Sequence, residues 1–146
     1  MKRLSLLMAA VIAAGCAGKP AEPPAQTFEE VLSSTLTEDD YGKSARCIAM
    51  TDYDAIRVLD SKHLLFEGLG NRNWLNTLRM DCPGLRKNAT LRIDARSSRL
   101  CNLDSVTGVE VRRFWMDRIS ATCSLGNFVP VTDEQAKFMK AEAKRR

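Results

Sequence analysis

Five cysteines constrain this chain more than any other feature of its sequence. Cys16 follows an apolar N-terminal stretch, whereas the other four are spread through the body of the chain, at Cys47, Cys82, Cys101 and Cys123. The gaps between those four are too wide for the closely spaced ligand pairs of a zinc site or for the CxxC pair of a redox centre. In an oxidising compartment, an even set of this kind predicts two structural disulfides.

The pairing of these cysteines has three solutions, and the sequence alone does not choose among them. The favoured prediction joins Cys47 to Cys123 and Cys82 to Cys101, because this nested scheme ties the first strand to the last and clips an inner segment. In the chain-entropy picture the inner bridge contributes ~3 kcal/mol and the outer one ~4 kcal/mol. Either is a large share of a total stability of ~5–15 kcal/mol.

The first residues have the pattern of an export signal. Lys2 and Arg3 give a basic start, and residues 4–14 are apolar except for Ser5. A stretch of this length is shorter than the roughly 20 residues that a membrane-spanning helix needs, and it predicts a removable leader. The sequence AAGC at residues 13–16 resembles the lipobox of bacterial lipoproteins. It predicts cleavage before Cys16 and acylation of that cysteine; the alternative is an ordinary secretory signal that is cut near Gly15.

Removal of the leader leaves 131 of the 146 residues, a length that suits one domain with a buried core. Lys2 and Arg3 leave with it, so the 22 basic residues against 18 acidic ones become 20 against 18. So small a surplus gives no reason to expect a nucleic-acid partner. Three prolines within residues 17–26 predict an extended tether.

We therefore predict a signal peptide over residues 1–15, a lipidated tether over 16–26 and a single domain over 27–146. The predicted location is the periplasm, with the N-terminal lipid in a membrane. Ala17, rather than an aspartate, follows Cys16, and in this the chain resembles lipoproteins that are sorted to the outer membrane. Two or three acyl chains hold a protein firmly, whereas a single chain does not.

Short antiparallel strands are predicted from residue 45 onward, where apolar residues alternate with polar ones and Gly, Asn, Asp and Ser interrupt the apolar runs. The clearest alternation covers residues 91–96. Residues 74–78 fit either a strand or one turn of helix. Gly108 and Gly126 are predicted to lie at turns or bulges. The other candidate strands are residues 47–50, 55–59, 64–67, 106–111 and 121–128.

Two capping boxes predict helices, one from Thr27 with Glu30 and one from Thr132 with Gln135. The second is followed by basic residues toward its end, which the helix dipole favours, and its apolar positions are sparse, so we expect a surface helix. The sequence as a whole predicts a mainly β fold, a small antiparallel sheet or barrel with a short N-terminal helix and a C-terminal helix.

Catalytic residue patterns are weak. His63 is the only histidine, so a relay would have to be built from it with its sequence neighbours Asp60 and Ser61, whose side chains we expect to point apart in a tight turn. The carboxylates of Asp52, Asp54, Asp60 and Glu67 could pair for glycoside hydrolysis, but solvated turn residues are the simpler interpretation. No metal site and no cofactor are predicted.

One segment combines cations with aromatic residues. Arg112, Arg113 and Arg118 surround Trp115 and its neighbour Phe114. Such a group could bind an anionic glycan, a lipid headgroup or an acidic envelope protein, with the tryptophan stacking on the ligand. The alternative is an ordinary sheet surface on which arginine stems cover apolar neighbours.

Four stretches together resemble a family of small, uncharacterised envelope lipoproteins of Gram-negative bacteria that contain a domain of unknown function. They are RCI at residues 46–48, LRMDCPGL at 78–85, LCNLD at 100–104 and CSLGNFVP at 123–130. The resemblance extends from about Cys47 to Pro130, implies two disulfides and one domain, and brings no assigned activity. The function expected is that of a non-enzymatic binding or structural module at the periplasmic face of the outer membrane; the alternative is a periplasmic hydrolase that uses turn carboxylates.

Overall fold

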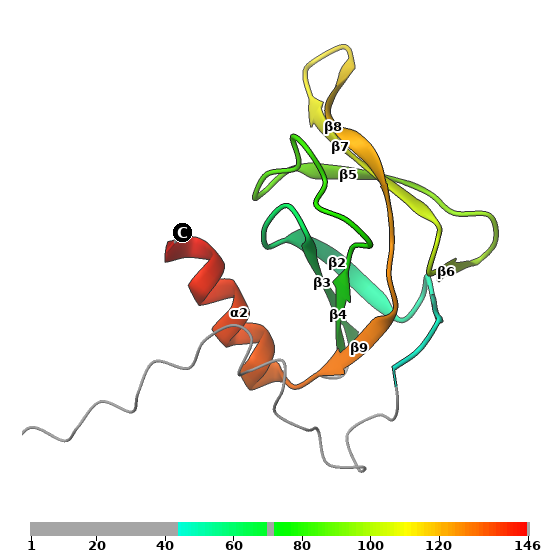
Figure 1. Ribbon diagram of the computed structural model, residues 1–146, viewed down its shortest axis with the longest axis vertical. Helices are drawn as coiled ribbons and strands as arrows, with labels where there is room; N and C mark the ends of the chain where they lie inside the picture. The colour runs from blue at the N-terminus through cyan, green and yellow to red at the C-terminus, as the bar shows by residue number, and fades with distance from the viewer. Residues whose placement is uncertain (1–43, 70–71, 146) are drawn as a thin grey trace, which may run out of the picture.

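The computed structural model of the chain describes residues 44–69 and 72–145, which form three antiparallel sheets and a C-terminal helix (Figure 1). The predicted mainly β fold is confirmed, and so is the helix at the C-terminus. The leader, the tether and the predicted helix at Thr27 lie outside the described residues. The elements are β1 (Cys47–Ala49), β2 (Tyr53–Val58), β3 (His63–Gly68), β4 (Asn73–Thr77), β5 (Thr90–Asp94), β6 (Arg99–Cys101), β7 (Ser105–Val111), β8 (Met116–Ser124), β9 (Phe128–Val131) and α2 (Asp133–Arg145).

The largest sheet has the strand order β2-β3-β4-β9 and is covered on both faces. In β3, Leu64 and Phe66 belong to the main core, while Leu65 between them belongs to the cluster under α2. Because both faces are buried, this strand is a continuous apolar run rather than an alternating one. Residues 74–78, which fitted strand or helix, lie mostly in β4, which pairs with β3 and β9.

The helix α2 begins at the capping box that the sequence predicts. The Thr132 hydroxyl accepts a hydrogen bond from the Gln135 backbone N–H, and the Gln135 side chain accepts one from the Thr132 N–H. Ala136 and Met139 are buried against the sheet, while much of the rest of the helix stays accessible. The predicted surface position of this helix is confirmed.

The second sheet has the order β5-β7-β8, and its edge strand follows the predicted alternation. Leu91 and Ile93 of β5 pack against the main core, while Arg92 and Asp94 are exposed. Gly108 lies at a bulge between Thr107 and Val109, as predicted. Its N–H donates to the Ser120 hydroxyl at 2.7 Å, and an added Cβ would lie 3.0 Å from that oxygen, so a side chain would crowd the bulge.

The prediction of one strand over residues 121–128 is wrong. Those residues hold the end of β8, the break at 125–127 and the start of β9, which lie in different sheets. The break has its own partners: the Leu125 N–H donates to the Asp104 carbonyl and the Gly126 N–H to the Asn76 side chain. These bonds satisfy the backbone where it leaves one sheet for the other.

The barrel alternative is also wrong, because the sheets do not close. β2 is an edge strand of the first sheet and β5 is an edge strand of the second. No backbone hydrogen bond joins these two strands in the part of the chain that the structure describes. The sheets therefore face each other across a shared core and keep free edges.

The disulfides pair Cys47 with Cys101 and Cys82 with Cys123, so the favoured nested scheme is wrong. The first bridge follows from the pairing of β1 with β6, which sets Cys47 opposite Cys101. The second follows from the loop after Cys82, which lies against β8 and whose Pro83 carbonyl accepts the Ala121 N–H. The two chain segments that the disulfides close therefore overlap in sequence. Which cysteines pair depends on which strands become neighbours and not on the order of the cysteines in the chain.

Candidate functional site

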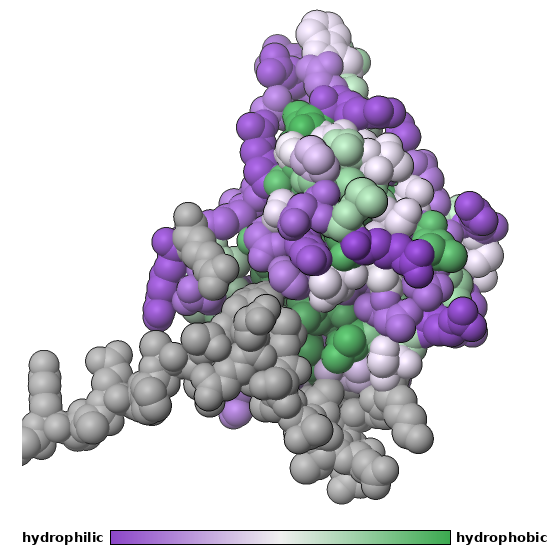
Figure 2. All heavy atoms as spheres, in the orientation of Figure 1, coloured by the Kyte–Doolittle hydropathy of each residue, from purple (hydrophilic) through white to green (hydrophobic). Residues whose placement is uncertain are grey.

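The hairpin formed by β7 and β8 projects from the rest of the fold, at the upper end of Figure 1. We call residues 111–118 the hairpin tip; every one of its residues is exposed. Four of them are large and apolar, with exposed fractions of 61% for Val111, 81% for Phe114, 62% for Trp115 and 56% for Met116. Figure 2 shows hydrophilic residues around this narrow end and paler ones at its extremity.

Backbone bonds shape the hairpin tip locally. Val111 of β7 lies opposite Met116 of β8, and the Arg112 N–H donates to the Trp115 carbonyl at 2.9 Å. Burial ends just below, because Val109 is 4% exposed whereas Val111 is largely in contact with solvent. The tip is thus held by its strand pairing and contributes no side chain to the buried core.

The cations of the hairpin tip divide into two kinds. Arg112 is held by Glu110 at 3.1 Å and by Asp117 at 3.5 Å. Arg113 and Arg118 form no ion pair within residues 44–69 and 72–145. The tip therefore has two arginines left over for a ligand, beside apolar side chains that water solvates poorly.

The two aromatic rings of the hairpin tip do not make one flat surface. Phe114 and Trp115 have ring centroids 6.5 Å apart and planes inclined at 49°. Such a pair is suited to wedging into a recess of a partner, whereas stacking on a sugar ring uses the flat face of a ring. The arrangement can contribute apolar burial and charge, but it contains no nucleophile and no acid–base pair.

The structure gathers the four residues of the predicted binding face, Arg112, Arg113, Trp115 and Arg118, at this one tip. Arg112, Arg113 and Trp115 lie in the turn between β7 and β8, whereas Arg118 lies within β8, opposite Val109 of β7. Val111 and Met116, which flank the turn, were not predicted as part of the binding face. A signal for them exists: from residue 111 to 116 apolar residues stop alternating with polar ones, as they do where a hairpin leaves a core.

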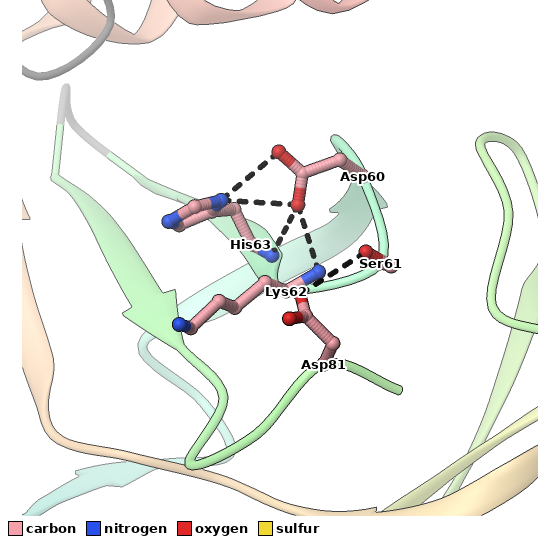
Figure 3. A network of polar contacts seen from close by, with 5 residues as sticks. All are labelled: Asp60, Ser61, Lys62, His63 and Asp81. Atoms are coloured by element: carbon pink, nitrogen blue, oxygen red, sulfur yellow. Dashed lines mark hydrogen bonds and ion pairs between the residues drawn. The ribbon is translucent and has the colours of Figure 1, made fainter. Parts of the chain in front are cut away.

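The relay around His63 is not assembled (Figure 3). Contrary to expectation, Asp60 and His63 do meet: the His63 Nδ1 lies 2.9 Å from an Asp60 carboxylate oxygen. The Ser61 hydroxyl instead donates to Asp81 at 3.3 Å. The Asp60 carboxylate also accepts the Lys62 and His63 backbone N–H groups, so its main contacts close the turn between β2 and β3.

Three of the four candidate carboxylates each have a hydrogen-bond or ion-pair partner of their own. Asp52 accepts the Ala49 N–H, and Asp60 faces His63. Glu67 lies between Arg57 of β2 and Lys140 of α2. The pair needed for glycoside hydrolysis is two carboxylates across a groove, and these contacts bring a carboxylate to a cation or an N–H instead.

Two of these carboxylates have perturbed pKa values. Partial burial raises the pKa of Asp60, but the hydrogen bonds from His63 and Lys62 outweigh it, so that pKa lies below its usual value. Burial likewise raises the pKa of Glu67, and Lys140 and Arg57 outweigh it, so that pKa is also lowered. Both groups are therefore held as carboxylates, which suits a structural ion pair better than a general acid.

Further functional groups are sparse in the described part of the chain. Within it no three His, Cys, Asp or Glu side chains gather as they would around a metal ion. Its helix is too short and too polar to cross a membrane. The two disulfides indicate an oxidising, extracytoplasmic compartment.

A comparison with protein families finds a match to a model described as "Family of unknown function (DUF6491)", over residues 1–146. No curated protein and no solved structure matches the chain. The family match extends beyond the stretch from Cys47 to Pro130 on which the resemblance in the sequence rests.

Proposed function

The chain belongs to this family of unknown function, whose description names no activity, and we propose from the site that it is a non-enzymatic binding module of the cell envelope. The hairpin tip is the part that binds, and its ligand is a protein. The proposal rests on one observation: consecutive large apolar side chains, Phe114 to Met116, stand in solvent beside two arginines without ion pairs.

A protein partner fits this chemistry for two reasons. Tryptophan, other aromatic residues, methionine and arginine are the residue types enriched in the cores of protein interfaces and at their hot spots. The tip is also convex and its two rings are inclined to each other, so it complements a recess better than a flat ligand. The matching surface on the partner is an apolar pocket with carboxylates at its rim, which would pair with Arg113 and Arg118.

The second part of the proposal concerns the location of the module in the cell. The chain is cleaved before Cys16, acylated there and held at the periplasmic face of the outer membrane. The leader pattern supports this, and the disulfides agree with an oxidising compartment. Mass spectrometry of the mature N-terminus is expected to find an acylated cysteine. In detergent phase partitioning, the variant Cys16→Ala is expected to be found in the aqueous phase instead of the detergent phase. If Cys16 were unmodified, the proposed lipid anchor would be wrong, whereas the proposed role of the hairpin tip would still stand.

The test of the hairpin tip is site-specific photo-cross-linking in intact cell envelopes. A photoreactive phenylalanine analogue at position 114 is expected to cross-link one reproducible protein. The matched control places the same analogue at Met80, which is 65% exposed and lies in the loop after β4. Adding Arg113→Glu and Arg118→Glu to the position-114 protein is expected to abolish the cross-link, because it reverses the charge that faces the partner.

Three outcomes would contradict the proposal. Equal cross-linking from positions 114 and 80 would show nonspecific contact. A cross-link to lipid would assign the tip to a bilayer, where tryptophan and arginine also favour the interface. A cross-link to peptidoglycan would assign it to a glycan. The first of these removes the site, and the other two keep it but change the class of ligand.

A further inference from the structure

A groove runs along β2, on the free edge of the larger sheet. Two connected cavities form it, of about 510 and 360 Å³. The first lies between the whole of β2 and residues 88–91, and the second lies between the end of β2, residues 87–88 and the last turns of α2. Both are lined by Arg57, Val58 and Asn88, so the groove is continuous. In Figure 1 the C-terminal end of α2 is turned toward the loop before β5.

The edge of β2 offers backbone groups to this groove. β2 pairs only with β3 among the described strands. In a strand that is paired on one side, every second residue directs its N–H and C=O away from its partner. The six residues of β2 span about 20 Å at ~3.3 Å per residue. The groove is thus long enough for an extended segment and has the hydrogen-bonding groups that such a segment would need.

The walls of the groove are partly apolar. Ile56 of β2 and Leu91 of β5 pack against the main core yet remain half-buried, because the two sheets do not close over them. At the other end Leu59 and Ala143 line the second cavity. Leu59 is already buried, but a ligand that filled the groove would complete the cover of Ile56, Leu91 and Ala143, which favours binding through apolar burial.

The end of the groove beside α2 is basic. Arg57, Lys87, Lys140 and Lys144 line it, and no carboxylate of the described residues lines that second cavity. Glu67 binds Arg57 and Lys140 from nearby and offsets part of their charge. Lys87 and Lys144 form no ion pair with any residue that the structure describes.

The opposite end of the groove is lined by Asp54. The charge therefore changes along the groove, from acidic beside the start of β2 to basic beside its end.

We propose that the β2 groove binds an extended, acidic peptide segment of a partner protein, which adds to β2 as an antiparallel strand. Strand addition is a common mode of peptide recognition, in which the backbone gives affinity and the side chains give specificity. An antiparallel segment runs opposite to β2, so its N-terminal residues lie at the basic end. The ligand is accordingly a segment with carboxylates at its N-terminal end, followed by alternating apolar residues. This site is separate from the hairpin tip and does not depend on it.

The experiment measures peptide binding to the full chain by fluorescence anisotropy. The probe is a short labelled peptide with two aspartates at its N-terminal end, followed by alternating valine and threonine. Two further peptides are compared with it, one with the aspartates moved to the C-terminal end and one with alternate backbone nitrogens methylated. Both are expected to bind more weakly, the first because the charges are misplaced and the second because the added strand loses its hydrogen bonds.

The matched protein variants test the basic end. Lys87→Glu combined with Lys144→Glu is expected to weaken binding of the probe at least about tenfold, since both changes replace attraction by repulsion. The control, Arg79→Glu with Lys137→Glu, makes the same change in net charge at exposed positions that do not line the groove. It is expected to leave the affinity within about twofold.

Several results would overturn the proposal. Binding that is unchanged by backbone methylation would exclude strand addition. Equal affinity for the peptide with C-terminal aspartates would exclude the antiparallel direction. Full displacement of the probe by inorganic pyrophosphate alone would assign the basic end to small anions, without a peptide. Equal losses in the charge-reversal variant and in its control would show that only net charge matters.

Discussion

The strand pair β3–β4 and the hairpin tip use similar side chains in opposite ways. Leu64, Leu65 and Phe66 of β3 are all 0% exposed, whereas Phe114 at the tip is 81% exposed. Both regions are β-hairpins in which consecutive apolar residues break the usual alternation. In the first, both faces of the sheet are covered, so burial of these apolar side chains stabilises the fold. In the second no described residue covers that surface, so mutations should separate stability from binding.

The largest effect is expected in the core, from Phe66→Ala. Phe66 is in edge contact with Tyr53 and with Phe128, each at 5.2 Å between ring centroids. Loss of this ring removes buried area and leaves a cavity between two sheets, so the free energy of unfolding should fall by ~3–5 kcal/mol. Denaturant unfolding measures it. A loss under about 1 kcal/mol would mean that the two sheets are not packed on a common core.

The second effect is expected from Cys82→Ser with Cys123→Ser, which removes the bridge between the loop after β4 and β8. The bridge spans 41 residues of sequence, for which the chain-entropy model gives roughly 4 kcal/mol. The loss should disappear when wild type and variant are compared under reducing conditions. When the single variant Cys82→Ser is alkylated in denaturant, the labelled thiol should be that of Cys123, which is buried in the folded chain; labelling of Cys101 instead would restore the nested pairing.

A smaller effect is expected from Asn76→Ala, at the break where the chain crosses between sheets. The Asn76 amide donates to the Gly126 carbonyl at 2.8 Å and its oxygen accepts the Gly126 N–H at 3.0 Å. Their loss leaves the N–H and the carbonyl of the half-buried Gly126 without these partners, at a cost of ~1–3 kcal/mol. The control Asn102→Ala removes an exposed hydrogen bond to Asn127 and should cost less than about 0.5 kcal/mol. Equal costs would mean that water replaces the Asn76 side chain at the break.

The sequence predicts the individual strands and helices of this fold better than it predicts which of them lie next to one another. Alternation at residues 91–96, the glycine at the bulge and the capping box before α2 are local signals, and each predicts its element correctly. The disulfide pairing and the break at 125–127 depend on which strands become neighbours. Cys47 meets Cys101 because β1 pairs with β6, across about fifty residues of chain. No local pattern encodes such a contact.

The candidate sites divide in the same way. The hairpin tip is one continuous segment, so Arg112 to Arg118 stand out in the sequence itself as a run of cations and aromatic residues. The β2 groove draws Arg57, Lys87 and Lys144 from three separate parts of the chain, and nothing in the sequence joins them. Glu67 shows this too, because its cations come from β2 and α2. A site that the topology assembles cannot be found from spacing alone.

A pH-dependent effect smaller still is expected from Glu67→Gln. The pKa of Glu67 is lowered in the folded chain, so its ion pairs stabilise the fold above the usual glutamate pKa of roughly 4.3. That stabilisation is lost as the pH falls through the lowered value. Because Arg57 is largely exposed, we expect only ~0.2–1 kcal/mol at neutral pH. Unfolding measured from pH 7 to pH 3 should show wild type and variant converging below about pH 4; parallel curves would contradict this.

The smallest effect on stability is expected from Trp115→Ala. The matched comparison is Trp74→Ala, which removes a buried tryptophan instead of an exposed one. Trp74 is 8% exposed and lies in the main core, so its loss should cost ~3–5 kcal/mol. Trp115 is 62% exposed, and its hydrogen bond to Arg112 uses the backbone carbonyl, which alanine retains. Its loss should stay within about 0.5 kcal/mol in denaturant unfolding while abolishing the cross-link from position 114. A cost above about 1 kcal/mol would mean that the tip belongs to the folded core, and the two tryptophans would then no longer mark separate uses of apolar surface.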